Sequence, residues 1–152
     1  MAFAKPFINP FLLLIIMSRY RKGANAEREL LQLLHKEGFA VVRVAGSGAT
    51  ALPCPDCLAL TKRKKFAFEC KAWKGKYLSI ARDQMQSLLS WSKQAGIPVY
   101  IAWKVPREGW LFIKPKDFKK SEKAYSIKLK DALRAGATLN VLIGKQKQLK
   151  VK

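Results

Sequence analysis

A short apolar run with a charged pair inside it constrains this chain more than any other feature. Residues 66–73 (FAFECKAW) are rich in aromatic side chains, as strands are, yet Glu69 and Lys71 interrupt them. Side chains two positions apart on a strand point to the same face, so a carboxylate and an ammonium group are expected side by side. Such a pair, taken alone, is usually a solvated sheet edge, and a functional site needs further support.

A second carboxylate supplies part of that support. Asp56 follows Pro53 and Pro55 and begins another strand-like run, residues 56–60. Acidic residues on adjacent strands can converge at one edge of a sheet, where their oxygens are ligands that Mg²⁺ prefers. The metal would lower the pKa of a water molecule and offset charge on a reacting phosphate, and a nearby lysine would hold either group. The pattern therefore predicts a nuclease site.

The charge of the chain agrees with a polyanionic substrate. Thirty Lys and Arg residues face ten Asp and Glu residues among 152, a formal net charge of +20. Neutralising phosphates is the usual use of such an excess, so nucleic acid is the leading partner. An anionic membrane surface or a ribosomal RNA would fit the same charge. With 49% hydrophobic residues, the composition excludes a disordered tail and fits one domain with its own core.

Hydrophobic periodicity predicts a mixed α/β domain. Helical spacing marks residues 24–36, 80–94 and 138–148, and strand-like runs cover residues 39–45, 56–60, 66–73, 97–103, 109–113 and 125–129. This order predicts a central mixed β-sheet flanked by helices.

The first residues are set apart from this domain. Residues 7–17 are apolar but fall short of the roughly 20 residues that span a bilayer, and they include Asn9 and Pro10. A signal anchor is one interpretation. We favour an extension over residues 1–16, with Met17 as the initiator, residues 17–152 as the nuclease domain and no stable membrane association.

The three cysteines, Cys54, Cys57 and Cys70, form no paired disulfide framework, which favours reduced thiols in the cytoplasm. Cys54 and Cys57 have the CxxC spacing of zinc and redox sites. A structural zinc needs four ligands, and Cys70 and His35 are the remaining candidates. Small packing thiols are therefore the favoured interpretation.

Several motifs occur in order between about residues 20 and 149. They are RKGANAEREL at 21–30, GFAVVR at 38–43, AGS at 45–47, PCPD at 53–56 and ECK at 69–71, followed by RDQM at 82–85, GIPV at 96–99, GWLFI at 109–113 and TLNVLIG at 138–144. Together they resemble an archaeal Holliday junction resolvase, a branch of the PD-(D/E)xK nuclease superfamily. The resemblance implies a restriction-endonuclease-like α-β-β-β-α-β core. Cys70 departs from it, because a β-branched aliphatic residue is common at that position.

The resemblance also implies roles for individual residues. Asp56 and Glu69 would be the main metal ligands, Glu27 would complete the acidic cluster directly or through water, and Lys71 would orient the nucleophilic water. Ser47, in the loop after the first strand, would approach the cleavage site. The residues expected to bind DNA phosphates are Arg21, Lys22, Arg28 and Arg43, and the basic turn adds Lys62, Arg63 and Lys64.

The sequence thus predicts a Mg²⁺-dependent endonuclease, with Mn²⁺ as a substitute, that resolves four-way DNA junctions by paired symmetric nicks. Two symmetric nicks favour a two-fold homodimer. No small-molecule substrate is expected. A related nuclease for other branched or flapped DNA is the first alternative, and a basic nucleic-acid-binding module without catalysis is the second.

Overall fold

Runs of consecutive strands lie between the helices of this chain. The computed structural model describes residues 9–44 and 52–147. The elements are α1 (Pro10–Lys36), β1 (Ala40–Arg43), β2 (Cys57–Leu60), β3 (Lys65–Ala72), β4 (Tyr77–Ala81), α2 (Arg82–Ala95), β5 (Val99–Val105), β6 (Gly109–Ile113), the 3₁₀ helix η1 (Pro115–Asp117), β7 (Lys119–Lys120), β8 (Ala124–Lys128), α3 (Leu129–Ala135) and α4 (Leu139–Leu142).

Within the described residues, five strands form a mixed central sheet in the order β1-β2-β3-β5-β6. β3 and β5 run parallel, from Ala67 opposite Val99 to Ala72 opposite Lys104, and the other neighbours are antiparallel. A parallel pair needs a crossover connection, which here passes through β4 and α2. The prediction of an α/β domain with a mixed central sheet is confirmed.

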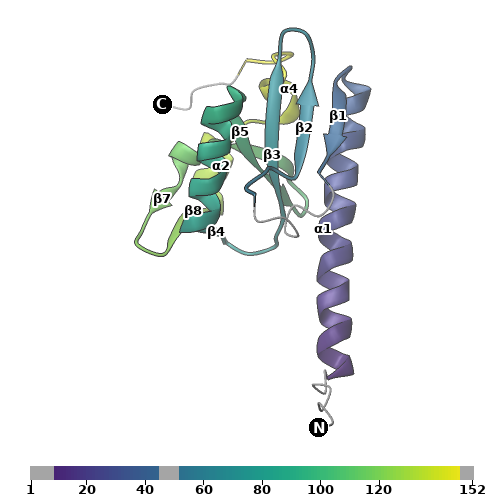
Figure 1. The fold of residues 1–152 in the computed structure, drawn as a ribbon, viewed down its shortest axis with the longest axis vertical. Helices are drawn as coiled ribbons and strands as arrows, with labels where there is room; N and C mark the ends of the chain where they lie inside the picture. The colour runs from purple at the N-terminus through teal and green to yellow at the C-terminus, as the bar shows by residue number, and fades with distance from the viewer. Residues whose placement is uncertain (1–8, 45–51, 148–152) are drawn as a thin grey trace.

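Each face of the sheet is buried under a different layer (Figure 1). Leu30 and Leu34 of α1 pack with Phe68 on one face. Met85 of α2 packs with Trp103 on the other, where β4, β8 and β7 add a small antiparallel sheet. Successive residues of β3 alternate between these two cores, because side chains of a strand alternate between faces. The alternation later decides on which face each site residue lies.

The first helix is much longer than the predicted residues 24–36. It begins at Pro10, and the Asn9 side chain caps it by accepting a hydrogen bond from the Phe11 N–H at 2.9 Å. Proline at the first helical position costs no hydrogen bond, so the helix starts there. Residues 11–20 are all exposed, and Figure 1 shows this part of α1 projecting beyond the sheet. None of the helices in the described part of the chain is long and apolar enough to cross a membrane.

Two other boundaries also differ from the prediction. The helix expected from residue 80 begins at Arg82, because residues 77–81 form β4 with alternating exposed and buried side chains. The helix expected over residues 138–148 is limited to Leu139–Leu142, and Gly144 follows with φ of 83°. The short helix α3 was not predicted.

Candidate active site

Asp56 stands one residue before β2 and takes part in the strand pairing. Its N–H donates to the Phe68 carbonyl at 2.9 Å, and its Oδ2 accepts from the Cys70 N–H at 2.8 Å. Cys57 lies opposite Phe68 in the register of β2 and β3. The next position therefore places Asp56 opposite Glu69, and directly opposite residues share a face. Two carboxylates meet across the two strands.

Glu69 is held in place by two donors. Its Oε1 accepts from the Lys71 Nζ at 2.7 Å and from the Gln84 Nε2 at 2.8 Å. Lys71 lies two residues along β3, so the prediction that it shares a face with Glu69 is confirmed. Gln84 reaches the same oxygen from the first turn of α2. The side chain of Glu69 is 7% exposed, which makes it a buried acid.

The electrostatics of this acid are unfavourable to its charge. Burial and the negative charge of Asp56 together raise the pKa of Glu69 to about 7, even though Lys71 opposes both effects. Two carboxylates in one partly buried place cannot both ionise without cost. Perturbed acids of this kind are typical of functional sites.

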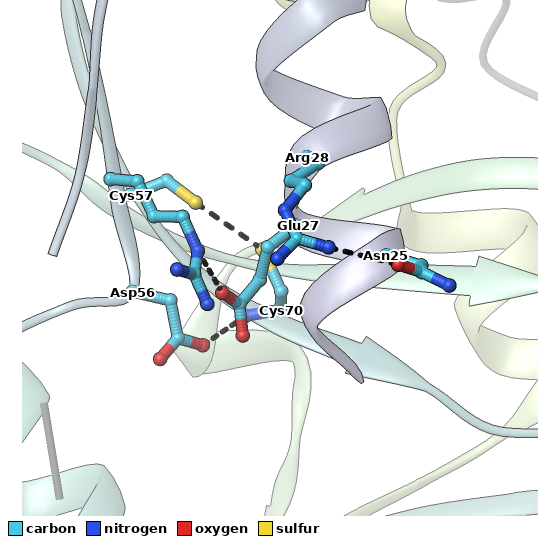
Figure 2. Close-up of polar contacts among 7 residues, drawn as sticks. Asn25, Glu27, Arg28, Asp56, Cys57 and Cys70 are labelled. Atoms are coloured by element: carbon cyan, nitrogen blue, oxygen red, sulfur yellow. Dashed lines mark hydrogen bonds and ion pairs between the residues drawn. The ribbon is translucent and has the colours of Figure 1, made fainter. Parts of the chain in front are cut away.

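Glu27 approaches Asp56 from α1. Its Oε2 accepts from the Arg43 Nε at 2.8 Å, and this contact raises the pKa of Arg43. Figure 2 shows Glu27 and Asp56 converging beside Cys70. Cys57 packs in the core under α1, with its Sγ 3.8 Å from that of Cys70. Glu27 therefore comes from the α1 side, whereas Glu69 faces α2.

The donor set fits a hard divalent cation at two of the three predicted ligands. Asp56 and Glu69 offer carboxylate oxygens, and a cation between them would offset the repulsion that raises the pKa of Glu69. Within the described residues, no three His, Cys, Asp or Glu side chains gather closely enough to hold a metal. Glu27 is turned toward Arg43, which agrees with a ligand that acts through water rather than directly.

Residues 18–151 match the family described as archaeal Holliday junction resolvase (Hjc). The chain belongs to this family. A crossover junction endodeoxyribonuclease Hjc of Archaeoglobus fulgidus is 39% identical over 106 residues, which cover 70% of this chain and 78% of the relative. The corresponding Hjc of Methanocaldococcus jannaschii is 38% identical over 134 residues, covering 88% and 95%.

The fold of this Hjc-family chain is also similar to a solved one. The structure of A. fulgidus Hjc, a Holliday junction resolvase, matches with a TM-score of 0.75 at 34% identity and covers 84% of this chain and 99% of that one. The match includes the central sheet and its helices, so the α/β fold predicted from the motifs is confirmed.

The basic residues of the Hjc-family domain lie in two separate places. Arg21 and Lys22 are exposed on α1, and both line a cavity between that helix and the ends of β3 and β5. Arg28 is exposed about two turns later and donates to the Asn25 Oδ1 at 3.0 Å. Arg43 donates a hydrogen bond to Glu27, so of these four basic residues it is the one that contacts an acid of the site.

The basic turn between β2 and β3 lies away from the acids. Lys65 begins β3 four residues before Glu69, a distance of roughly 13 Å along a strand. Lys62 and Arg63 are exposed beyond it, and the Lys64 Nζ donates to the Ile143 carbonyl. The structure therefore does not bring Lys62, Arg63 and Lys64 to the acidic site. Ser47 lies outside the described residues.

Gln84 is a site residue that the sequence motifs identified less securely than the acids. It occurs in the RDQM motif at the start of α2, but its approach to Glu69 depends on where that helix begins. The predicted helix over residues 80–94 already contained Gln84, but it did not indicate that Glu69 lies against the first turn of that helix. The signal that was available is the alternation of residues 77–81, which marks the strand that ends just before the helix.

Proposed function

We propose that this crossover junction endodeoxyribonuclease cuts DNA at the site formed by Asp56, Glu69 and Lys71, with Glu27 as the fourth participant. The observation that carries the proposal is the opposed pair of carboxylates, of which Glu69 is buried and has its pKa raised to about 7. A structural core does not retain such a pair without compensation, and both a divalent cation and a nearby lysine supply it.

Asp56 and Glu69 would hold Mg²⁺, with Mn²⁺ as a substitute, and the ion would supply Lewis-acid stabilisation of the charged phosphate. Gln84 and Lys71 fix the Glu69 carboxylate through its Oε1. Glu27 contributes negative charge at the opposite side of Asp56, and Arg43 fixes its position. The ligand set is thus two direct carboxylates and one that acts through water.

Lys71 is placed to handle the reacting groups. Its side chain is 27% exposed, and the Nζ lies 2.7 Å from Glu69. An ammonium group in this position can donate to a water molecule or to a phosphate oxygen once DNA is bound. We expect Ser47 to act beside the scissile phosphate. In-line attack of a water molecule on the phosphorus, with the 3′ oxygen as the leaving group, would leave 5′-phosphate ends that a ligase can seal.

The substrate is a four-way junction that the enzyme resolves by paired symmetric nicks. A two-fold homodimer would present two equivalent sites to it, and Leu89, 40% exposed on α2, offers an apolar contact for such an interface. Arg21, Lys22, Arg28, Arg43 and the turn with Lys62, Arg63 and Lys64 would bind phosphates. We further propose that residues 17–152 form the nuclease domain and that the enzyme works in the cytoplasm.

The decisive experiment compares a labelled four-way junction with matched duplex, flap and fork substrates, in Mg²⁺ and in EDTA. Paired nicks on the junction, lost in EDTA and in Asp56→Asn, are the expected result. Asp56→Asn should keep its affinity for the junction, since the substitution removes none of the positively charged side chains that would bind phosphates. Cleavage of flaps instead of junctions would show that the nuclease has a different substrate. Tight binding without cleavage in any divalent metal would show a DNA-binding module without catalysis.

A further inference from the structure

A cavity of about 540 Å³ opens beside the active site and has no part in the chemistry described so far. It lies between α1 and the carboxyl ends of the parallel strands β3 and β5, near the point where α1 extends past the sheet in Figure 1. Small apolar residues, Ala26 and Ala72, line it. Trp73 and Pro106 also line it, and the remaining lining side chains are polar or charged: Ser18, Arg21, Lys22, Asn25, Lys74 and Lys104.

The lining of the cavity is positively charged. Four of its lining residues have positively charged side chains, and none of the described residues that line it is acidic. Lys104 is engaged with Glu29 of α1, which leaves Arg21, Lys22 and Lys74 exposed at the rim. An unbalanced group of cations around an apolar floor selects an anionic ligand with an apolar part. A nucleotide of a DNA strand has both.

Trp73 supplies a flat apolar surface at this cavity. It is 54% exposed, whereas Trp103 is fully buried and Trp110 is 8% exposed. The Trp103 Nε1 donates to the Trp73 carbonyl at 3.0 Å, which fixes the backbone. The indole rests on Gly75, where an added Cβ would come 2.2 Å from its Nε1. The ring is therefore held at the cavity without being covered.

The position of the cavity relative to the acids defines what can enter it. Trp73 follows Lys71 by two residues, about 7 Å of extended chain. Glu69 and Lys71 face α2, whereas Ala72 packs on the α1 side. A strand that contacts both places must turn around the end of β3. A base-paired duplex presents its bases inward, so the part of a junction that fits is a nucleotide released when a base pair opens at the branch point.

We propose that this cavity binds an unpaired nucleotide of the DNA substrate, with its base stacked on Trp73 and its phosphates against Arg21, Lys22 and Lys74. The inference rests on the proposed function, because it adds a binding subsite to the same enzyme. Stacking on an aromatic side chain tolerates any base, which suits an enzyme that recognises junction shape. The exposed flat indole beside these cations favours a nucleotide as the occupant.

Binding of the full-length protein to a fluorescent 12-nucleotide dT strand in EDTA tests the proposal. A second strand of equal length, made of abasic nucleotides, keeps the phosphates and removes the bases. We expect Trp73→Ala to weaken binding of the dT strand about tenfold and to leave binding of the abasic strand unchanged. Trp73→Phe should retain most of the affinity. The matched control is Tyr77→Ala, another exposed aromatic (58%) that does not line the cavity.

Two further measurements separate stacking from charge. Quenching of tryptophan fluorescence by the dT strand should disappear in Trp73→Phe, a variant that keeps a ring in place. Lys74→Ala should reduce the slope of log affinity against log salt by about 0.7 for a lost contact to single-stranded DNA, and Lys93→Ala on α2 should not. Equal dT affinity in Trp73→Ala and the wild type would overturn the proposal, as would equal losses on both strands.

The binding tests are independent of the proposed function. They need no cleavage, so a chain that fails to cut junctions in Mg²⁺ but shows the dT-specific loss in Trp73→Ala retains the subsite and loses the nuclease assignment. A chain that cuts junctions normally, with a Trp73→Ala variant that binds dT as the wild type does, retains the nuclease and loses the subsite.

Discussion

Two glutamates flank Asp56, and their surroundings differ in a way that assigns them different work. The Glu69 side chain is 7% exposed and faces another carboxylate, and its pKa is raised to about 7. The Glu27 side chain is 18% exposed and is already paired with the guanidinium of Arg43. A buried acid with a like-charged neighbour gains most from an added cation, whereas an acid with its own arginine gains little. The difference supports the proposal that Glu69 is the direct ligand and Glu27 the supporting one.

The largest effect should follow the loss of the Glu69 charge. We expect Glu69→Gln to lower the rate of junction cleavage by about 10³-fold or more, because a neutral amide is a poor ligand for Mg²⁺ and roughly 4 kcal/mol of stabilisation would be lost. Single-turnover cleavage of a labelled junction measures it. Glu108→Gln removes the same charge from an exposed turn and should cleave normally. A Glu69→Gln enzyme with near-normal rates would remove Glu69 from the metal site.

The raised pKa of Glu69 predicts a pH dependence of stability in EDTA. The folded protein binds a proton between pH 4.5 and about 7 that the unfolded chain has released, so the stabilising contribution is complete below 4.5 and is lost as pH rises through 7. The free energy of unfolding should fall by up to about 3 kcal/mol across this window. Urea unfolding at pH 5 and pH 8 measures it.

Glu69→Gln should abolish this part of the pH dependence, since the amide does not titrate. Mg²⁺ added at pH 8 should raise the free energy of unfolding of the wild-type protein and not that of Glu69→Gln, because the ion binds the folded state. If both proteins lose the same free energy between pH 5 and pH 8, the titration of Glu69 is not the cause of the pH dependence.

A double-mutant cycle on Glu27 and Arg43 tests the other half of the comparison. Glu27→Gln and Arg43→Gln should each reduce cleavage by about 10- to 100-fold, because each leaves its partner unfixed beside Asp56. The double variant should cleave as fast as the less active of the two single variants, since the two residues act as a unit. Losses that multiply instead would show independent roles, with Glu27 a direct ligand and Arg43 a DNA contact.

The sequence located the direct pair more securely than the supporting one. Strand alternation placed Glu69 and Lys71 on one face, and their hydrogen bond confirms it. That rule is local and needs no knowledge of other elements. The approach of Glu27 to Arg43 joins α1 to an edge strand across 16 residues, and nothing in either segment encodes that distance. The role of Glu27 therefore came from the resemblance to a family.

The predicted boundaries of helices and strands were wrong where the local sequence pattern was ambiguous. Ile80 fits both the helix that follows and the strand that precedes, and the pairing of β4 with β8 decides for the strand. Such pairing is non-local, so the small second sheet was not predictable. Asn9 and Pro10, a cap and a first-turn proline, indicate the early start of α1, although the sequence-based interpretation used them only as evidence against a membrane span.

Gln84 offers a smaller test of how firmly Glu69 is held. Gln84→Ala should lower the cleavage rate about tenfold, because Glu69 would keep Lys71 as a donor and lose the one from α2. Gln86→Ala, an exposed glutamine on the same helix, is the matched control. The concentration of Mg²⁺ needed for half-maximal rate should rise in Gln84→Ala, which a general loss of folding would not produce. An unchanged Mg²⁺ requirement would mean that Lys71 alone positions the carboxylate.

The smallest effect concerns the helix that carries Glu27. Its residues 11–20 are exposed, whereas Leu30 and Leu34 of the same helix are fully buried. If the inner half alone positions Glu27, a chain that starts at Met17 should cleave junctions within about twofold of the full chain and unfold within about 0.5 kcal/mol of it. Leu30→Ala, which opens a cavity in the inner half, should cost about 2–5 kcal/mol. A truncated chain that loses activity while remaining folded would show that the exposed half of α1 contributes to the acidic site, and the environment of Glu27 would no longer be set by Arg43 alone.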